Sequence, residues 1–284
     1  MSLSTSTPSH RLPPVPRGEL LARLEAVLPR HCIISETESL RPFECDALTI
    51  YRELPLLVAL PDTVEQVQQV LRICHELAVP VVARGAGTGL CAGSMPHPEG
   101  VLLGLSKLDR VLDIDPLART ARVQPGVSNS AISAAVAHHG LYYGPDPSSQ
   151  IACSIGGNVA ENSGGVHCLK YGLTVHNILA LEVLTVAGER VSIGSAGLDT
   201  PGYDLLALMT GSEGLLGVVV EVTVRLLPSP EVAQVIMAGC PSVTAAGDAV
   251  GAVIAAGIIP AGLEMMDRLA IQAAEDFAHA GYPR

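Results

Sequence analysis

The sequence predicts an α+β fold made of two small mixed lobes, and three patterns support this prediction. First, residues 55–84 contain an apolar run, an amphipathic segment and a second apolar run, which implies a parallel βαβ unit with a right-handed crossover. Second, short strands are expected to follow at 101–105, 110–115 and 120–124. Third, residues 218–227 alternate apolar and polar side chains, as in a strand with one buried face.

Capping signals predict where the first two well-marked helices begin and end. Asp62 and Glu65 stand at capping-box spacing. Ser128 is expected to cap a helix that runs through Val136, and Gly140 to end it. The expected apolar face of the earlier helix consists of Val64, Val67, Val70, Leu71, Cys74 and Leu77.

The rest of the chain divides into a hairpin, a short helix and a different C-terminal part. Strands at 179–186 and 190–194 are expected to pair across Ala187–Gly188, and a short helix is expected at 204–209. Beyond Pro230 the sequence predicts a strand at 233–239 and helices at 243–256 and 264–280. The first of these helices is expected to be buried, because it extends into the uncharged, apolar run at 249–263. The expected units are an N-terminal arm and helix at 1–51, a main domain at 52–230 and the beginning of another domain at 231–284.

Composition excludes several classes of function. The 284 residues are 48% hydrophobic and carry a formal net charge of −11, which argues against a nucleic-acid partner. No apolar run has the length of a membrane span, and the first residues lack the apolar centre of a signal peptide. Seven cysteines without a Cys-x-x-Cys pair suit a reducing cytoplasm and do not suit a disulfide framework or an iron–sulfur site. No metal site is expected, since His167 beside Cys168 is a weak pair on its own.

The stretch VVARGAGTGLCAGSMP at 81–96 predicts a loop that approaches a ligand closely. It is not the dinucleotide-binding fingerprint, because Leu90 stands where glycine is required and the following prolines prevent a helix. It is not a P-loop either, because no Gly-Lys-Ser/Thr follows. Two interpretations remain: a tight turn between strands, or an anion nest in which backbone N–H groups of 85–90, Arg84 and the Thr88 hydroxyl bind phosphate without a helix dipole.

Two further glycine-rich segments point to the same kind of ligand. Residues 144–172 show little periodic order, and a loop of that length inside a domain is usually functional. Gly156–Gly157 and Gly164–Gly165 are expected to let the backbone lie against a flat ligand, because side chains there would intrude. Polar groups for that ligand are Asp146, Ser154, Asn158 and Asn162. The third segment, GSEGLLGVVVEV at 211–222, is weak alone because Gly211 can simply stop a helix.

Together, in this order, the three segments resemble the FAD-binding domain of the vanillyl-alcohol oxidase / p-cresol methylhydroxylase superfamily. Within it, the chain is most similar to the group that contains glycolate oxidase FAD subunits and D-lactate and D-2-hydroxyglutarate dehydrogenases. The resemblance extends over 52–230 and weakly over 258–267. It implies a two-lobed FAD-binding domain of the PCMH type, followed by the start of an α+β, ferredoxin-like cap domain.

The resemblance also implies which residues bind the cofactor. Residues 84–90 look like the loop around the FAD pyrophosphate, 145–149 and 154–165 like the segments along the ribityl chain and isoalloxazine, and 211–219 like the segment near the adenine end. Thr88 stands where members with a covalent flavin carry histidine, so FAD is expected to be held non-covalently. The expected cofactor-binding residues are Arg84, Gly85, Ala86, Gly87, Thr88, Gly89, Leu90, Pro145, Asp146, Ser149, Ser154, Ile155, Gly156, Gly157, Asn158, Ala160, Asn162, Gly164, Gly165, Gly214, Val218 and Val219.

The implied reaction is oxidation of a D-2-hydroxy acid, glycolate or D-lactate, to the 2-oxo acid with hydride transfer to flavin N5. In such relatives the substrate clamp, metal ligands and catalytic histidine lie in the cap domain. No catalytic residue is therefore assigned within 1–284, and this chain alone is expected to be inactive. The alternative is a non-catalytic FAD-binding subunit or pseudoenzyme. Implied partners are a second flavin-like subunit and an iron–sulfur subunit, with a cytoplasmic location or peripheral attachment to the inner membrane through them.

Overall fold

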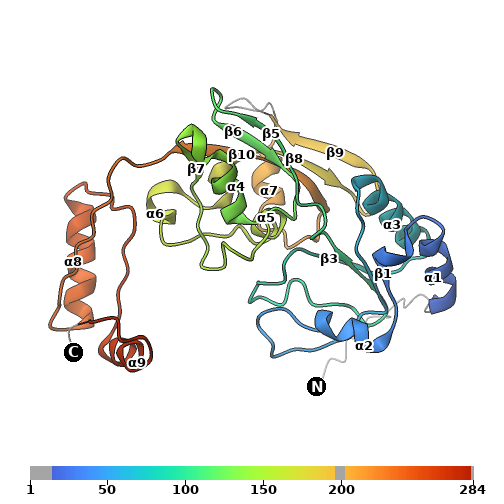
Figure 1. The fold of residues 1–284 in the computed structure, drawn as a ribbon, viewed down its shortest axis with the longest axis horizontal. Coiled ribbons are helices and arrows are strands. Elements are labelled where there is room, and N and C mark those ends of the chain that lie inside the picture. The colour runs from blue at the N-terminus through green and yellow to red at the C-terminus, as the bar shows by residue number, and fades with distance from the viewer. Residues whose placement is uncertain (1–14, 196–201, 283–284) are drawn as a thin grey trace, which may run out of the picture.

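The computed structural model describes residues 15–195 and 202–282, which form two lobes and a C-terminal arm (Figure 1). The first lobe contains a four-stranded sheet in the order β1-β2-β4-β3. The second contains a six-stranded sheet in the order β5-β6-β10-β8-β9, with β7 paired to β10. The predicted α+β class with two mixed lobes is confirmed.

In the first lobe, the predicted βαβ unit is present, but another strand lies inside it. β2 (Leu57–Ala59) leads through α3 (Val64–Glu76) to β3 (Val81–Arg84), and β4 (Val101–Gly104) pairs in parallel with both. β1 (Ile33–Ile34) adds an antiparallel edge to β2. The helices α1 and α3 and the strands β2 and β4 bury apolar side chains in one core, and the partly buried Val81 and Ala83 of β3 pack against it. The remaining elements of this lobe are α1 (Arg17–Glu25), η1 (Arg30–Cys32), α2 (Thr37–Leu40) and η2 (Arg41–Phe43).

The start of α3 differs from the predicted capping box. Thr63 is the N-cap, and its hydroxyl accepts the backbone N–H of Gln66. Gln66 in turn accepts the N–H of Asp62 through Oε1 at 2.7 Å. Asp62 and Glu65 are therefore not the capping pair, because the Asp62 carboxylate is turned toward Lys107, whose Nζ lies 2.9 Å away. The predicted apolar face is present, with Val67, Val70, Leu71 and Cys74 buried.

The second lobe is centred on the longest strand, β10 (Val218–Pro228), which pairs with β6, β7 and β8. As predicted, Ser128 caps α4, and Gly140 (φ +68°) follows its last turn in the left-handed conformation. The other predicted strands and the short helix at 205–209 are also present. The remaining elements are β5 (Val111–Asp115), β6 (Thr120–Val123), α4 (Asn129–Val136), η3 (Ala137–His139), β7 (Leu141–Tyr143), α5 (Ile155–Glu161), α6 (Cys168–Tyr171), η4 (Thr174–Asn177), β8 (Ile178–Leu184), β9 (Arg190–Gly194) and α7 (Leu205–Met209).

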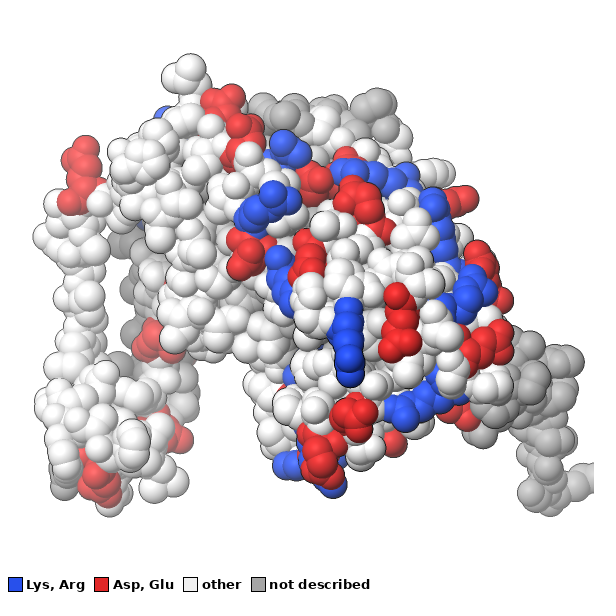
Figure 2. All heavy atoms as spheres, turned by 45° about the vertical axis from the view of Figure 1, so that its right-hand side comes forward, with Lys and Arg blue, Asp and Glu red and all other residues white. Residues whose placement is uncertain are grey.

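The outer face of the six-stranded sheet is polar and ion-paired. Burial alternates along β10, so that Glu221, Thr223 and Arg225 share the less buried face as predicted. Glu221 lies 2.9 Å from Arg122 of β6 and 2.9 Å from Arg190 of β9, so one carboxylate links the adjacent strand β6 and the more distant edge strand β9 to β10. Figure 2 shows basic and acidic side chains interspersed over the body of the molecule.

The C-terminal arm departs from the sequence prediction in three ways. Residues 233–239 are extended and exposed but form no strand, because no described strand lies beside them to complete a ladder. α8 (Val243–Ala255) is present but has no buried residue, so the helix expected to be buried lies on the surface. α9 (Arg268–Ala278) begins later than predicted because Asp267 caps it, accepting the N–H of Ala270 at 2.8 Å. None of the helices in the described ranges has the length and apolar character needed to cross a membrane.

Stability of the first lobe is expected to depend on its central strand. Leu103 of β4 is fully buried between β2 and β3, so Leu103→Ala removes apolar contacts and leaves a cavity. We expect a loss of about 2–5 kcal/mol in the free energy of unfolding, measured by urea denaturation. Leu117→Ala is the matched control, since Leu117 is 97% exposed; a comparable loss in both variants would contradict this placement of the core.

Candidate functional site

The glycine loop after β3 offers a row of unused backbone donors. As predicted, residues 85–100 contain no helix. Among the described residues, no protein atom accepts a hydrogen bond from the N–H groups of 85–90. The Gly87 carbonyl is held by the N–H of Ala47 at 3.0 Å, and φ at Gly87 is +71°. Such a run of free N–H groups near the surface is what an anion nest requires.

This loop is pressed against the first turn of α5, which contradicts the expectation that no helix end lies nearby. A Cβ added to Gly85 would collide with the Ser154 hydroxyl oxygen and lie 3.6 Å from the backbone nitrogen of Gly157. Ser154 is the N-cap of α5. The sequence analysis missed α5 because its seven residues include two adjacent glycines, which lower helix propensity. Tertiary contacts therefore supply the reason for helix formation here.

The donors of that helix end are already occupied. The N–H groups of Ile155 and Gly156 donate to carbonyls of Val127 and Pro125, at 2.9 and 2.8 Å. The Gly157 N–H donates to Ser154 Oγ at 3.4 Å. An anion at this place would therefore use the loop's N–H groups, and α5 would contribute only its dipole.

Three of the four glycines at 156–157 and 164–165 pack closely against the protein itself, which corrects, for these three, the expectation that they leave room for a flat ligand. A Cβ on Gly156 would lie 2.6 Å from Pro125 Cβ, and one on Gly164 would lie 2.6 Å from Leu173 Cδ2. At Gly165 a Cβ would meet the Asp146 backbone. Gly157 is less crowded, with Ser154 Oγ at 3.2 Å. The region 144–172 is therefore a folded unit containing α5 and α6, and not one long loop.

The predicted polar ligands mostly hold this unit together. Asp146 Oδ2 lies 2.6 Å from His167 Nδ1, so His167 has a carboxylate partner instead of a metal pair with Cys168. The buried Asn158 amide donates to Asn129 at 2.9 Å. Asn129 in turn donates to the Pro145 carbonyl at 2.7 Å, so the loop after β7 is tied to α5.

Several other predicted residues make contacts within the protein. Ile155, Val218 and Val219 are buried in the protein core. The Asn162 side chain, at φ +53°, accepts the N–H of Val175 at 3.1 Å. The Ser149 carbonyl accepts N–H groups from the turn that follows it.

The third predicted segment, 211–219, lies in contact with the other two predicted segments. The N–H of Glu213 donates to the Ala160 carbonyl at 2.9 Å, and Gly214 (φ +75°) lies beside Ala83, where an added Cβ would be 3.8 Å away. The segments around residues 85, 154 and 214 therefore converge at the carboxyl end of β3.

Acidic residues that the sequence analysis missed also face this loop. A Cβ on Gly93 would lie 3.1 Å from Glu161 Oε1 and 3.2 Å from Glu213 Oε2, so both carboxylates lie at the loop. Asp46 is 4% exposed, and its Oδ2 has no hydrogen-bond partner. No local motif marks them, because each comes from a different part of the chain.

Arg84 is turned inward rather than out toward a ligand. Its guanidinium lies against Gly87 and donates to the Cys45 carbonyl at 2.8 Å. Burial lowers the pKa of Arg84, while the neighbouring Cys45 and Asp46 act in the opposite direction. The arginine thus fixes the segment at 45–47 to the glycine loop.

A separate cluster near α3 has metal-binding residue types but is already neutralised. His31, Cys32 and Asp62 bring possible ligand atoms within 4.8 Å of one another. Lys107 occupies the same carboxylate, and its hydrogen bond is the main cause of the lowered pKa of Asp62. The ammonium group therefore already stands where a cation would bind.

The residues present fit a dinucleotide cofactor with a pyrophosphate group. The free N–H groups of 85–90 suit phosphate oxygens, and the unpaired, buried carboxylate oxygen of Asp46 suits a hydroxyl donor. No nicotinamide-type glycine fingerprint opens a helix from this loop. A two-lobed fold with this site is that of a flavin-binding domain.

Comparison with known proteins also indicates a flavin-binding domain. Residues 55–194 match the family model described as an FAD binding domain, and 229–284 match the C-terminal domain of FAD linked oxidases. The chain belongs to this family of FAD-linked oxidoreductases. It is 62% identical over 272 residues to the glycolate oxidase subunit GlcD of Escherichia coli strain K12, which covers 96% of this chain and 54% of the relative. It is 41% identical to GlcD of Bacillus subtilis strain 168, covering 85% of this chain and 52% of the relative.

The chain spans about half the length of these curated relatives. Among solved structures, alkyldihydroxyacetonephosphate synthase matches with a TM-score of 0.68 at 21% identity, covering 78% of this chain and 42% of that one. This likeness concerns the fold alone; together with the match to the FAD binding domain, it confirms the expected PCMH-type architecture.

The acidic side of the loop leads to a prediction about pH. Burial, and next the charges of Glu213 and Asp46, raise the pKa of Glu161 in the folded state. The folded protein thus favours the protonated form, so the free energy of unfolding falls as pH rises from the ordinary carboxyl pKa through the raised one. Glu161→Gln removes this titration, and we expect higher stability than wild type at pH 7 and a flatter pH profile.

Urea denaturation between about pH 4 and 8 measures this difference. The matched control is Glu25→Gln, which removes an exposed carboxyl of α1. If the free energy of unfolding of Glu161→Gln falls with pH as steeply as that of wild type, the Glu161 carboxyl is not the cause of the pH dependence.

Proposed function

We propose that this chain binds FAD non-covalently and forms the flavin-binding part of an enzyme that oxidises a D-2-hydroxy acid, glycolate or D-lactate, to the 2-oxo acid. The observation that carries the proposal is the glycine loop, whose N–H groups at 85–90 have no acceptor in the described part of the protein. The identity to two glycolate oxidase subunits supports the substrate class. Thr88, which offers a hydroxyl and no nucleophilic ring nitrogen, supports non-covalent attachment.

In this proposal the loop binds the pyrophosphate through backbone N–H groups, and Ser154 sets the distance between the loop and α5. The Asp146–His167 and Asn129–Asn158 contacts hold the backbone of 145–165 for the rest of the cofactor. The bound flavin supplies the hydride acceptor.

No described residue is proposed as the catalytic base. Burial, above all, raises the pKa of both Tyr142 and Tyr143, so these phenols stay protonated at neutral pH. Tyr143 also pairs with β10 through its backbone, in the core of the second lobe. The tyrosines therefore support structure, and the base belongs to the cap domain whose start we place at 231–284, after an FAD-binding domain at 52–230.

Assembly belongs to the same proposal. The relatives are named as subunits of glycolate oxidase, which supports partners for this chain. We propose a second flavin-like subunit and an iron–sulfur subunit as those partners, with a cytoplasmic location or attachment to the inner membrane through them.

The first test is the cofactor itself. We expect the purified chain to carry a flavin absorbance that acid precipitation releases entirely into the supernatant as FAD. Addition of glycolate or D-lactate to the chain alone is expected to leave that absorbance unchanged, because we place the catalytic base in the cap domain. Flavin that stays with the precipitate contradicts non-covalent binding, and substrate-dependent bleaching contradicts the assignment of the base to the cap.

A second test separates ligand contact from packing within the glycine loop. Gly89→Ala adds a methyl group whose nearest protein atom, Glu161 Oε1, lies 3.6 Å away, so the free protein tolerates it. We expect FAD affinity to fall about tenfold or more, which corresponds to about 1.4 kcal/mol, while the melting temperature of the FAD-free protein is unchanged. Fluorescence titration of FAD and thermal unfolding measure the two effects.

Two further variants serve as controls. Gly85→Ala forces a Cβ against Ser154 and is expected to lower the stability of the FAD-free protein by about 1–3 kcal/mol. Gly18→Ala, with no atom within 4 Å of the added Cβ, is expected to change neither quantity. Unchanged FAD affinity in Gly89→Ala would remove the loop from the proposed site.

A further inference from the structure

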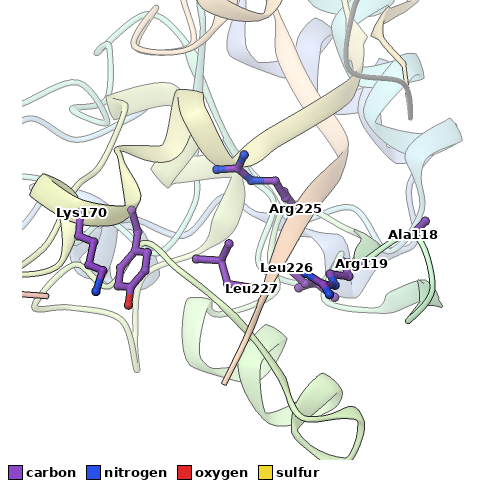
Figure 3. Close-up of a pocket in the computed structure, with 7 residues that line it drawn as sticks. Ala118, Arg119, Lys170, Arg225, Leu226 and Leu227 are labelled. Atoms are coloured by element: carbon purple, nitrogen blue, oxygen red, sulfur yellow. The ribbon is translucent and has the colours of Figure 1, made fainter. Parts of the chain in front are cut away.

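A cavity of about 450 Å³ lies at the end of β10, outside the glycine-loop site. It is bounded by the turn between β5 and β6, by α6 and by the last residues of β10 (Figure 3). In Figure 3, Lys170 stands on one side, Arg119 on the other and Leu227 between them, and the Arg225 guanidinium points toward the side of Lys170. The lining residues are Ala118, Arg119, Lys170, Tyr171, Arg225, Leu226 and Leu227.

Every charged side chain that lines this cavity is basic. Arg119, Lys170 and Arg225 come from three different elements, and no acidic residue lines the cavity. The chain as a whole has 28 acidic and 17 basic residues, so composition favours the opposite sign. A concave site with one sign of charge attracts the opposite ion more strongly than scattered charges do.

These three cations also lack the partners that neighbouring arginines have. Within the described residues, none of the three makes an ion pair; Arg225 only donates to the Asn177 amide oxygen at 3.3 Å, and Lys170 lies 5.5 Å from the centre of the Tyr171 ring. On the same face of the sheet, Arg122 and Arg190 are paired with Glu221 at 2.9 Å. The cavity thus has basic side chains without ion pairs to any described residue, on a sheet face where Arg122 and Arg190 are ion-paired.

The backbone around the cavity holds these side chains in a fixed arrangement. The Leu226 N–H donates to the Arg119 carbonyl at 2.8 Å, which ties the turn to β10. Arg119 itself has φ +55°, a conformation rare for a residue with a Cβ, so the turn is maintained by its surroundings. Leu227 packs toward the position of a Cβ on Gly144, which connects the floor of the cavity with the loop after β7.

We propose that this cavity binds a small multivalent organic anion, of the phosphate or polycarboxylate class, at a site distinct from the flavin. The two guanidinium groups supply planar, paired donors for carboxylate or phosphate oxygens, and Lys170 adds a point charge. Leu227 and the Tyr171 ring give an apolar wall for the carbon skeleton of the ligand. Because the three cations are exposed, binding weakens as salt increases.

The test uses the whole chain saturated with FAD, with pyrophosphate and citrate as probes in isothermal titration calorimetry. Sodium chloride at matched ionic strength controls for screening. We expect one saturable site for one or both probes, and the tighter of the two identifies the ligand class. Saturation with FAD keeps pyrophosphate from the glycine loop, and the variants below distinguish the two sites in any case.

Pocket variants identify the site that the probe occupies. Lys170→Met and Arg119→Asn are each expected to weaken binding about tenfold or more, since each removes charge-assisted hydrogen bonds. Asparagine is chosen at 119 because it tolerates the left-handed conformation. Arg122→Gln is the matched control: it removes one positive charge from the same sheet face, but from an arginine that is already ion-paired. FAD affinity and melting temperature are expected to stay unchanged in all three variants.

Two results would overturn the proposal. One is the absence of heat and of saturation with both probes above the chloride control. The other is an equal loss of affinity in Arg122→Gln and in the pocket variants, which would mean general attraction by surface charge and not a site.

Discussion

The close contact between Gly85 and Ser154 is the constraint on which the rest of the site depends. The Ser154 hydroxyl occupies the space that a side chain at 85 would need, and it also caps α5. This contact joins the end of β3 in the first lobe to α5 in the second. As a result, the loop's backbone N–H groups lie in one place with no protein acceptor, although the residues that surround them are far apart in sequence.

Backbone and side-chain polar groups have different roles at the candidate site. Backbone donors of 85–90 are free for a ligand, whereas most polar side chains of 145–165 are engaged within the protein. The nearby acids Asp46, Glu161 and Glu213 oppose the binding of an anion, and the raised pKa of Glu161 makes the local charge depend on pH. Backbone recognition tolerates these acids because the N–H dipoles are fixed by the loop's own geometry.

The pairing of charged side chains differs between two parts of the six-stranded sheet. At its centre, Arg122 and Arg190 share the Glu221 carboxylate, so the face is close to neutral. At the end of β10, Arg119 and Arg225 have no such partner among the residues that the structure describes, and both line a cavity. The same strand therefore contributes both a neutralised surface and a concentration of positive charge within an acidic chain.

The sequence by itself determined the α+β class, most strands, the cap of α4 and the glycine loop, because these depend on periodicity, capping residues and glycine content within short windows. Only the tertiary structure decided that β4 lies between β2 and β3, that Gly156–Glu161 is helical and that Asp46 and Glu161 face the loop. These features rest on contacts between distant segments, such as Pro125 against Gly156, which no local pattern encodes.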